Sequence, residues 1–374
     1  MLAPLGGLAG FDGDFFATRL RLGLRVRPVR GPQFFAEFQD SEAFALSGEA
    51  AHSAFGNTGD VHQLYAQWGG DDSGWRLRAG RQELPLGDER LLGADRDWCN
   101  VGRSFDAVAL EHRTAAAAVT FLAGTSVRPR NARLDRFLSP DRVAGVHARF
   151  ATAGGRLEAA PYTLFTLRRA EGELPTRSIA TIGGQVQARL HPALTLAGEL
   201  AHQAGRWGSL SASGWAGSWD VAYTAPWSDH APTITGGFSY ASPAGDRRAS
   251  FDDLYPAGYN SAGLVDPFAW RNLKNAALSL EWPVVPRVRL ALEQHFYWRA
   301  SAADGVYVDD GLPIPLSGHE TWLGSHANAA LFFQVHEKIE GRAGWGWFVP
   351  GQLLRESGVP RRSRTLYVSL EYSL

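Results

Sequence analysis

The sequence contains very little cysteine and very little lysine. Its single cysteine, Cys99, excludes an internal disulfide framework and any cysteine metal cluster. Lys274 and Lys338 are the two lysines, so 35 of the 37 basic residues are arginine. Because a guanidinium group holds a carboxylate in fixed bidentate geometry, this bias is relevant to acidic ligands.

Long apolar runs and a strong net charge are also absent. No run of about 18 apolar residues occurs, which excludes a transmembrane helix. The formal net charge of −1 offers no attraction to nucleic acid, so we expect no nucleic-acid partner. The start "MLAPLGGLAG" has neither the basic residues nor the sustained apolar core of a signal peptide. Two explanations stay open: a cytoplasmic protein, or a sequence that begins downstream of the native start.

Signatures of enzymes and metal sites are sparse. The 11 histidines are scattered, and none forms a His-x-x-x-His motif. Residues 7–14 and 69–74 are acidic and glycine-rich, but the first lacks full ligand spacing for calcium and the second fits a tight turn. We therefore expect no catalytic residues, no cofactor and no metal. A lipid hydrolase built on a membrane barrel would need a serine and a histidine that meet on the lipid face, and no convincing pair is present.

Glycine, aromatic residues and alternating patterns are abundant. The chain has 42 glycines, 13 tryptophans and 10 tyrosines, a composition typical of curved sheets and interfacial aromatic girdles. The stretch "TRLRLGLRVRP" (18–28) places arginine on one face of a strand and aliphatic residues on the other. By itself this strand fits a half-exposed soluble sheet or a membrane barrel.

The same alternation continues along nearly the whole chain, while helical periodicity is almost absent. Aromatic residues stand near the ends of the apolar faces, for example Trp68, Trp282 and Tyr372, as membrane interfaces require. Most segments are close to the 9–11 residues that a tilted membrane-spanning strand needs. The predicted strands are 18–28, 33–42, 61–68, 75–86, 104–113, 116–127, 142–151, 155–168, 178–190, 194–207, 210–225, 231–243, 273–284, 287–299, 323–338, 339–350 and 363–374. We therefore predict an all-β protein, a single transmembrane antiparallel β-barrel of 16–18 strands.

The connections between these segments alternate between short and long, with one exception at 208–209. Outer-membrane barrels combine short periplasmic turns with longer extracellular loops, so the pattern predicts the orientation of every strand. Strand 18–28 would run toward the periplasm, and a further upward strand is expected before it, upstream of Met1 or within residues 1–16. We expect residues 1–16 to be an N-terminal remnant or partial first strand, and residues 17–374 to form the barrel.

Residues 80–108, "GRQELPLGDERLLGADRDWCNVGRSFDAV", carry a motif-rich pattern: G-R-Q, G-D-E-R-L-x-G, D-W, N and G-R-x-F-D-A. This stretch resembles the alginate-export family of outer-membrane porins. The resemblance implies an 18-stranded barrel, a signal peptide, and passage of an anionic polysaccharide through an electropositive lumen. Charges of both signs alternate in the 87–103 loop, and we expect it to fold inward, with Trp98 and Phe105 as apolar anchors. Cys99 receives no role.

We predict an outer-membrane channel for passive passage of an anionic, alginate-like polysaccharide or oligosaccharide. Arginines facing the lumen are expected to attract the substrate, because rings of arginine line anion-selective pores. We expect this most of the arginines at 19–27 and 76–78, since few acids nearby in the sequence balance them. The candidates for the substrate path are Arg19, Arg21, Arg76, Arg78, Arg81, Arg90 and Arg103. The candidates that position the loop and these arginines are Gln82, Asp88, Glu89, Asp97, Trp98, Asn100 and Asp106. The alternative to substrate binding, for any one arginine, is an ion pair with a neighbouring strand that stabilises the barrel wall.

A general anion-selective porin for small organic acids is the main rival function, since it shares every large-scale feature. The expected surroundings are outer-membrane lipid and periplasmic proteins that deliver substrate. We expect the chain to be a monomer.

Overall fold

The computed structural model describes most of the chain. The described residues are 16–44, 55–70, 74–94, 99–130, 134–135, 140–152, 154–227, 230–246, 248–258, 267–308, 313–359 and 363–373.

These residues form one sheet of 18 strands, and the fold class predicted from alternation is confirmed. All 17 predicted segments correspond to strands, and a two-residue strand, β13, is added. The strands are β1 (Phe16–Val26), β2 (Gln33–Phe44), β3 (Asn57–Trp68), β4 (Gly74–Gln82), β5 (Phe105–Arg113), β6 (Ala117–Ser126), β7 (Arg142–Ala151), β8 (Leu157–Arg168), β9 (Arg177–His191), β10 (Leu194–Trp207), β11 (Leu210–Thr224), β12 (Thr233–Ala241), β13 (Arg248–Ala249), β14 (Leu273–Val285), β15 (Val288–Arg299), β16 (Trp322–His336), β17 (Ile339–Pro350) and β18 (Ser363–Tyr372).

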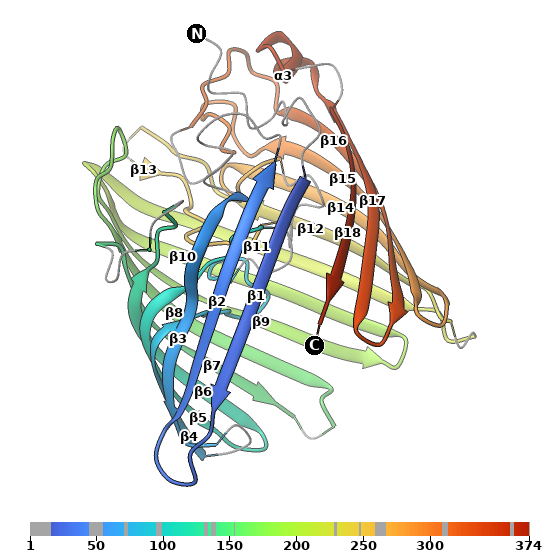
Figure 1. Ribbon diagram of the computed structural model, residues 1–374. Helices are drawn as coiled ribbons and strands as arrows, with labels where there is room; N and C mark the ends of the chain where they lie inside the picture. The colour runs from blue at the N-terminus through green and yellow to red at the C-terminus, as the bar shows by residue number, and fades with distance from the viewer. Residues whose placement is uncertain are drawn as a thin grey trace.

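Each long strand pairs antiparallel with the next one along the chain, from β1–β2 through β12–β14 to β17–β18. The sheet curls around a central space, so that β1 and β18 both lie at the front of Figure 1. Within the described part of the chain, β1 pairs with β2 and β18 with β17, and these two strands are the edges of the sheet. A further strand was expected before residue 18, upstream of Met1 or within residues 1–16, and residues 1–15 lie outside the described residues.

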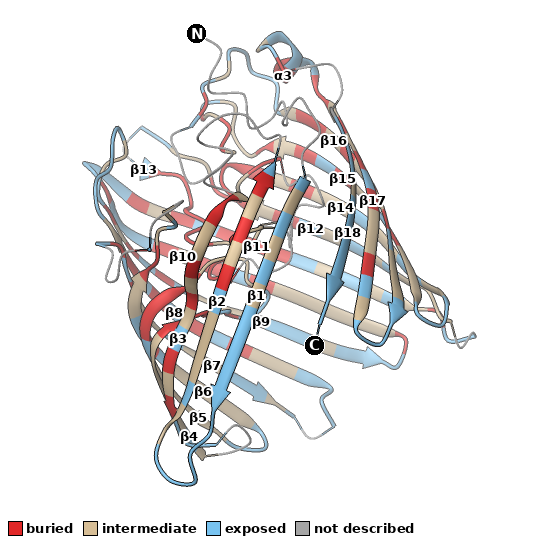
Figure 2. Cartoon of the chain, viewed as in Figure 1, coloured by how far each residue is buried: buried red, intermediate tan, exposed pale blue. Residues whose placement is uncertain are grey.

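Alternation divides the wall into an apolar outer face and a polar inner face. Leu20, Leu22 and Leu24 of β1 are all more than half exposed, as lipid-facing residues are when no lipid surrounds them. On β2, by contrast, Gln39 and Ser41 face inward and are fully buried. Figure 2 shows these buried positions toward the upper end of β2. The barrel wall is therefore apolar outside, and its interior is filled at one end.

The long connections gather at the upper end of Figure 1 and most hairpin turns lie at the other end. The tight turn at 208–209 is the exception noted in the sequence, since the Gly208 amide donates to Thr176 O of the long β8–β9 connection at 2.8 Å. A short helix, α3 (Gln352–Glu356), lies among the upper connections, where Leu353 and Leu354 are buried. No helix within the described ranges is long and apolar enough to cross a membrane.

Strand β4 ends four residues earlier than the sequence predicts. It ends at Gln82, whereas the predicted segment extends to residue 86. Pro85 has no backbone N–H to donate to a neighbouring strand, and Glu83 is drawn toward His62, with 3.0 Å between Oε1 and Nε2. The chain leaves the wall here and turns into the interior.

The main hydrophobic core lies inside the barrel. Inward-facing residues of the wall, such as Phe105 and Leu164, pack against residues of two long connections, such as Leu92 and Phe251. All four side chains are completely buried. A barrel wall in lipid has little apolar core of its own, so these connections supply the residues that fill the interior.

Gly80 on β4 permits a close approach between β4 and β3. Its φ is +127°, and a Cβ at this position would lie 2.3 Å from the backbone oxygen of Leu64. Replacing Gly80 with alanine is expected to destabilise the barrel by about 1–3 kcal/mol, because the backbone would be strained and the two strands forced apart. Urea unfolding of the refolded protein measures this loss. Gly236 is the control, since a Cβ added there would meet nothing within 4 Å; equal losses for Gly80→Ala and Gly236→Ala would contradict the prediction.

Candidate functional site: two inward-folded connections and an arginine-lined cavity

The connection between β4 and β5 crosses the interior of the barrel. Gln185 on β9 donates a hydrogen bond of 2.7 Å to Asp88 Oδ1. Arg90 lies 3.2 Å from the carboxylate of Asp88 and 3.6 Å from that of Glu199 on β10. Because β9 and β10 are far along the sheet from β4, these contacts tie the connection to a distant part of the wall.

The connection between β12 and β14 (residues 242–272) meets the first one inside the barrel. Leu92 and Tyr255 form a parallel bridge. The Tyr255 amide donates to Leu91 O at 3.0 Å, and the Gly93 amide donates to Tyr255 O at 2.9 Å. The two connections thus satisfy each other's backbone groups, which buried chain segments require.

Arg103 joins the two connections. Its Nη1 donates to the backbone oxygens of Tyr255 at 2.8 Å and Pro256 at 2.7 Å, and lies 3.4 Å from that of Gly93. Arg103 also lies over the Tyr255 ring, 5.9 Å from its centroid. A guanidinium group can bind several carbonyls at once because its donors diverge in one plane. The geometry therefore makes Arg103 a clamp between the connections.

A buried charge cluster ties the 242–272 connection to the wall. Asp252 is completely buried and pairs with Arg177 of β9 at 2.9 Å. Gln203 of β10 accepts from the Asp252 amide and donates to its carbonyl. Burial alone would raise the pKa of Asp252, but the charges of Arg271, Arg177 and Arg168 outweigh it and hold that pKa below its usual range. Burial raises the pKa of the neighbouring Asp253.

A cavity of about 530 Å³ lies where the two connections meet. Three acids, Asp141, Glu171 and Asp253, and three aromatic residues, Tyr255, Phe268 and Trp270, contribute to its lining. Four arginines also line it: Arg90, Arg103, Arg128 and Arg168. Arg90 lies over the Trp270 ring at 5.0 Å, and Arg168 over the Tyr255 ring at 5.2 Å. Cations beside aromatic faces in a cavity of this size suit a carboxylate-bearing ring.

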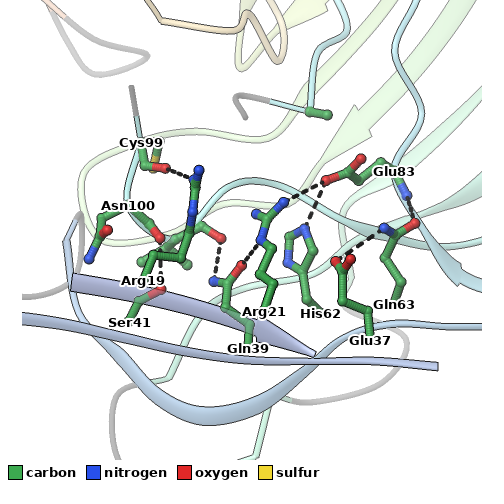
Figure 3. A network of polar contacts seen from close by, with 12 residues as sticks. Arg19, Arg21, Glu37, Gln39, Ser41, His62, Gln63, Glu83, Cys99 and Asn100 are labelled. Carbon is green, nitrogen blue, oxygen red and sulfur yellow. Dashed lines mark hydrogen bonds and ion pairs between the residues drawn. The ribbon is translucent and has the colours of Figure 1, made fainter. Parts of the chain in front are cut away.

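Two arginines predicted on β1, Arg19 and Arg21, contact the β4–β5 connection (residues 83–104; Figure 3). Arg19 Nη1 donates to Cys99 O at 3.1 Å. Arg21 donates to Gln39 Oε1 at 2.5 Å and lies 3.5 Å from Glu83 Oε1. Asn100 Nδ2 lies within 3.2 Å of three backbone oxygens, those of Thr18, Glu42 and Phe55. These contacts fasten the connection to β1 and β2.

The arginines on β4 are engaged with their neighbours in the sheet. Arg76 pairs with Glu111 at 2.9 Å, and Arg78 donates to Gln67 at 3.0 Å. Arg81 is 2% exposed and pairs with Asp106 at 2.9 Å.

These partners correct one premise of the sequence analysis. Arg21 and Arg76 were expected to attract substrate because few acids balance them. That premise is wrong, since Glu83 and Glu111 lie beside them. Register in the sheet, which sequence alternation does not reveal, brings these acids close.

The remaining predicted residues have varied positions. Gln82 is buried and donates to Ala107 O at 2.9 Å, across the β4–β5 pair. Glu89 is a candidate for positioning the loop and the arginines, and its carboxylate accepts the Ala94 amide at 2.7 Å, a contact within the loop itself. Asp97 and Trp98 lie outside the described residues. Phe105, predicted as an apolar anchor, is completely buried in the interior core.

Sequence reasoning missed the 242–272 connection altogether. It was noted only for its length, although "FDDLY" (251–255) and "WRN" (270–272) combine aromatic and charged residues. This concentration of aromatic and charged residues in a long loop was the available sign that the loop packs inside the barrel. Arg177, Asp252 and Arg271, which hold this connection, were not predicted.

Comparison with known proteins places this geometry in a family. The sequence matches the family described as Alginate export over residues 5–368. Among curated proteins, none matches.

Solved structures share the fold. The outer membrane protein OpdK from Pseudomonas aeruginosa is 11% identical with a TM-score of 0.66, and the match covers 96% of this chain and 94% of that one. OccAB4 from Acinetobacter baumannii is 11% identical with a TM-score of 0.58, over 96% and 94%. Pseudomonas aeruginosa OpdK solved with vanillate is 10% identical with a TM-score of 0.62, over 95% and 92%.

The fold and the family together support an outer-membrane channel and point away from an enzyme. The match spans nearly the whole chain, including the motif at 80–108 and the strands on either side of it. This protein therefore belongs to the alginate export family of bacterial outer-membrane β-barrels.

Proposed function

We propose that this protein is a passive channel for an anionic polysaccharide or oligosaccharide, with no covalent chemistry. The observation that supports the proposal is the cavity between the inward-folded connections, which four arginines and three aromatic residues line. Uronate polymers combine a carboxylate with an apolar sugar face on each unit. Guanidinium groups bind the first and aromatic rings pack against the second.

Arg90 and Arg103 are the members of the predicted substrate path that line this cavity. Arg128 and Arg168 join them in the proposal. Because most of these groups also bind protein atoms, the cavity would attract anions through its field more than through uncommitted donors.

The second candidate is a porin for small organic acids. The cavity of about 530 Å³ is within the usual size of small-molecule sites. Among the structural relatives, OpdK was solved with vanillate, an aromatic carboxylate. A channel of this kind would bind such acids and ignore the polymer.

The reversal potential of single channels under a salt gradient tests the proposal, measured with and without added polyuronate. We expect anion selectivity and blocking events that depend on the polymer. A cation-selective pore, or one that polyuronate leaves unaffected while small aromatic carboxylates block it, would overturn the polysaccharide function.

Arg76 and Arg78 stay in the proposed path, on the part of β4 that follows a short turn. Replacing both with glutamate is expected to abolish or reverse the anion preference, because four units of charge change inside the barrel. Reversal potentials of the double variant give the result. If selectivity is unchanged, these two arginines brace the wall and take no part in the path.

A further inference from the structure

Four side chains on the inner face of β1 to β4 form a continuous row, close to the turn that joins β1 and β2 at the lower end of Figure 1. Arg25 of β1 lies over the ring of Phe35 of β2, with 5.0 Å from Cζ to the ring centroid. The Phe35 ring lies 5.2 Å from the ring of Tyr65 of β3. Arg78 of β4 lies over the Tyr65 ring at 4.4 Å. The row therefore has a guanidinium group at each end and two aromatic rings between them.

The register of the sheet builds this row. Arg25 pairs with Phe35 across β1 and β2, and Phe35 pairs with Tyr65 across β2 and β3. Arg78 lies diagonally across from Tyr65 in the β3–β4 pair. Cross-strand neighbours on one face of a sheet are close enough for aromatic and long side chains to touch. Gly23 leaves room for the Phe35 ring, since a Cβ added there would lie 3.4 Å from its edge. The strands of the wall, which are rigid elements, hold all four side chains.

Contact with the rings orients the guanidinium groups without occupying their hydrogen-bond donors. An aromatic ring attracts a cation through its π face, whereas a guanidinium group donates through its five N–H groups. Arg25 is exposed, and among the described residues no carboxylate lies within ion-pair distance of it. Gln67 Oε1 accepts a hydrogen bond of 3.0 Å from Arg78, which fixes the direction of that side chain. Each end of the row is thus oriented to receive a carboxylate.

The two guanidinium groups are too far apart to share one carboxylate. Arg25 and Arg78 approach the pair of rings from β1 and from β4, with β2 and β3 between these strands. Neighbouring strands lie about 4.8 Å apart. The two oxygens of a carboxylate lie close together and match one guanidinium fork. A ligand that uses both ends of the row must therefore carry two separate carboxylates.

We propose that this row binds two acidic sugar units of a linear oligosaccharide, so that the channel prefers an oligomer to a single sugar acid. Each guanidinium group binds the carboxylate of one unit. Phe35 is partly exposed, so its ring can pack against the apolar face of a sugar, while the buried Tyr65 supports it. The inference rests on the proposed polysaccharide function and adds to it a second binding site, which shares no residue with the cavity lined by four arginines.

Current block of single channels by mono-, di- and triuronate tests the proposal. We expect wild type to bind diuronate at least about tenfold more tightly than monouronate, because the second carboxylate adds a charge-assisted contact. A third unit should add little. Arg25→Gln removes one end of the row and is expected to bring the affinities for monouronate and diuronate close together.

Two further variants separate the row from general charge. Phe35→Leu keeps every charge but removes the ring beneath Arg25, and it is expected to weaken block by diuronate about two- to fivefold. Arg30→Gln is the matched control, because Arg30 is an exposed residue of the turn between β1 and β2 and its replacement removes the same charge. The preference for diuronate should be as strong in Arg30→Gln as in wild type.

Equal affinity of wild type for monouronate and diuronate would overturn the proposal. So would a preference for diuronate that Arg25→Gln retains in full, or one that Arg30→Gln loses to the same extent. Long polyuronate, measured in the same experiment, distinguishes this failure from failure of the proposed function. If it blocks all these channels alike, the polysaccharide function stands without this row. If it blocks none, including wild type, both proposals are wrong.

Discussion

Replacing Asp252 with alanine is expected to release the 242–272 connection from the barrel wall and to raise single-channel conductance. Asp252 is completely buried, and its carboxylate pairs with Arg177 at 2.9 Å. Arg271, almost as deeply buried, lies over the rings of Trp207 and Tyr307 and adds to the positive charge around Asp252. Removing one partner of a buried pair leaves the other charge uncompensated, at a cost of about 3–5 kcal/mol.

The loss of this ion pair destabilises the attachment of the connection more than it destabilises the barrel wall. The strands β9 and β10 are expected to keep their backbone pairing in the variant, whereas the connection loses its buried ion pair with Arg177. We therefore expect a folded barrel whose interior is less filled, with faster proteolysis within residues 242–258. Planar-bilayer conductance and limited proteolysis are the measurements.

Glu281→Ala is the matched control. Glu281 pairs with Arg289 at 3.3 Å, but the Glu281 side chain is 59% exposed. Exposed pairs of this kind contribute about 0–1 kcal/mol, so conductance and proteolysis should stay as in wild type. Equal behaviour of the two variants would show that Asp252 does not hold the connection.

Acid should have the same effect on the wild-type channel. The pKa of Asp252 in the folded protein lies below the ordinary value of 3.8. A carboxyl group whose pKa is lowered by folding stabilises the folded state when the pH is above its pKa in the unfolded chain. This stabilisation is lost as the pH falls through the lowered pKa of the folded state. Conductance of wild type is therefore expected to rise below about pH 4, and Asp252→Ala should lack this rise. A rise of equal size in both proteins would assign the acid response to other groups.

Replacing Arg128 with glutamate is expected to reverse the ion selectivity of the channel. Four arginines and three acids line the cavity of the wild type. The substitution leaves three arginines and four acids around the same space. Because low-dielectric walls focus the field of such charges, a change of sign here should dominate the selectivity of the pore.

Arg128 suits this test because its side chain is 41% exposed and contacts two acids, Asp141 and Glu171, each at 2.6 Å. Its replacement leaves the clamp at Arg103 untouched. Arg128→Gln removes one charge and should give an intermediate reversal potential. The measurement is the reversal potential of single channels under a salt gradient.

Arg289→Glu is the control for the position of the charge. Arg289 is similarly exposed at 39% and also pairs with a glutamate, but it lies near the short turn between β14 and β15. A much smaller shift than that of Arg128→Glu is expected. An unchanged reversal potential in Arg128→Glu, or an equal shift in Arg289→Glu, would remove the cavity from the determination of selectivity.

The strands, their order and the two faces of the wall could be predicted from the amino-acid sequence. In the segments 287–299 and 363–374, apolar and polar residues alternate with the period of a strand, and both segments form strands with nearly the predicted bounds. This information is local, because the direction of each side chain follows from its position along one strand. The motif at 80–108 added the family, which the match over residues 5–368 confirms.

The residues that fill the barrel could not be predicted in this way, because they meet only in the folded chain. The contact of Arg103 with Tyr255 joins residues 152 positions apart, and that of Arg177 with Asp252 joins residues 75 positions apart. No alternation encodes such pairs, since each depends on where a long connection returns to the wall. The acids beside Arg21 and Arg76 were hidden for the same reason. Strand patterns follow from neighbours along the chain, whereas the chemistry of the interior follows from residues that only the folded chain makes neighbours.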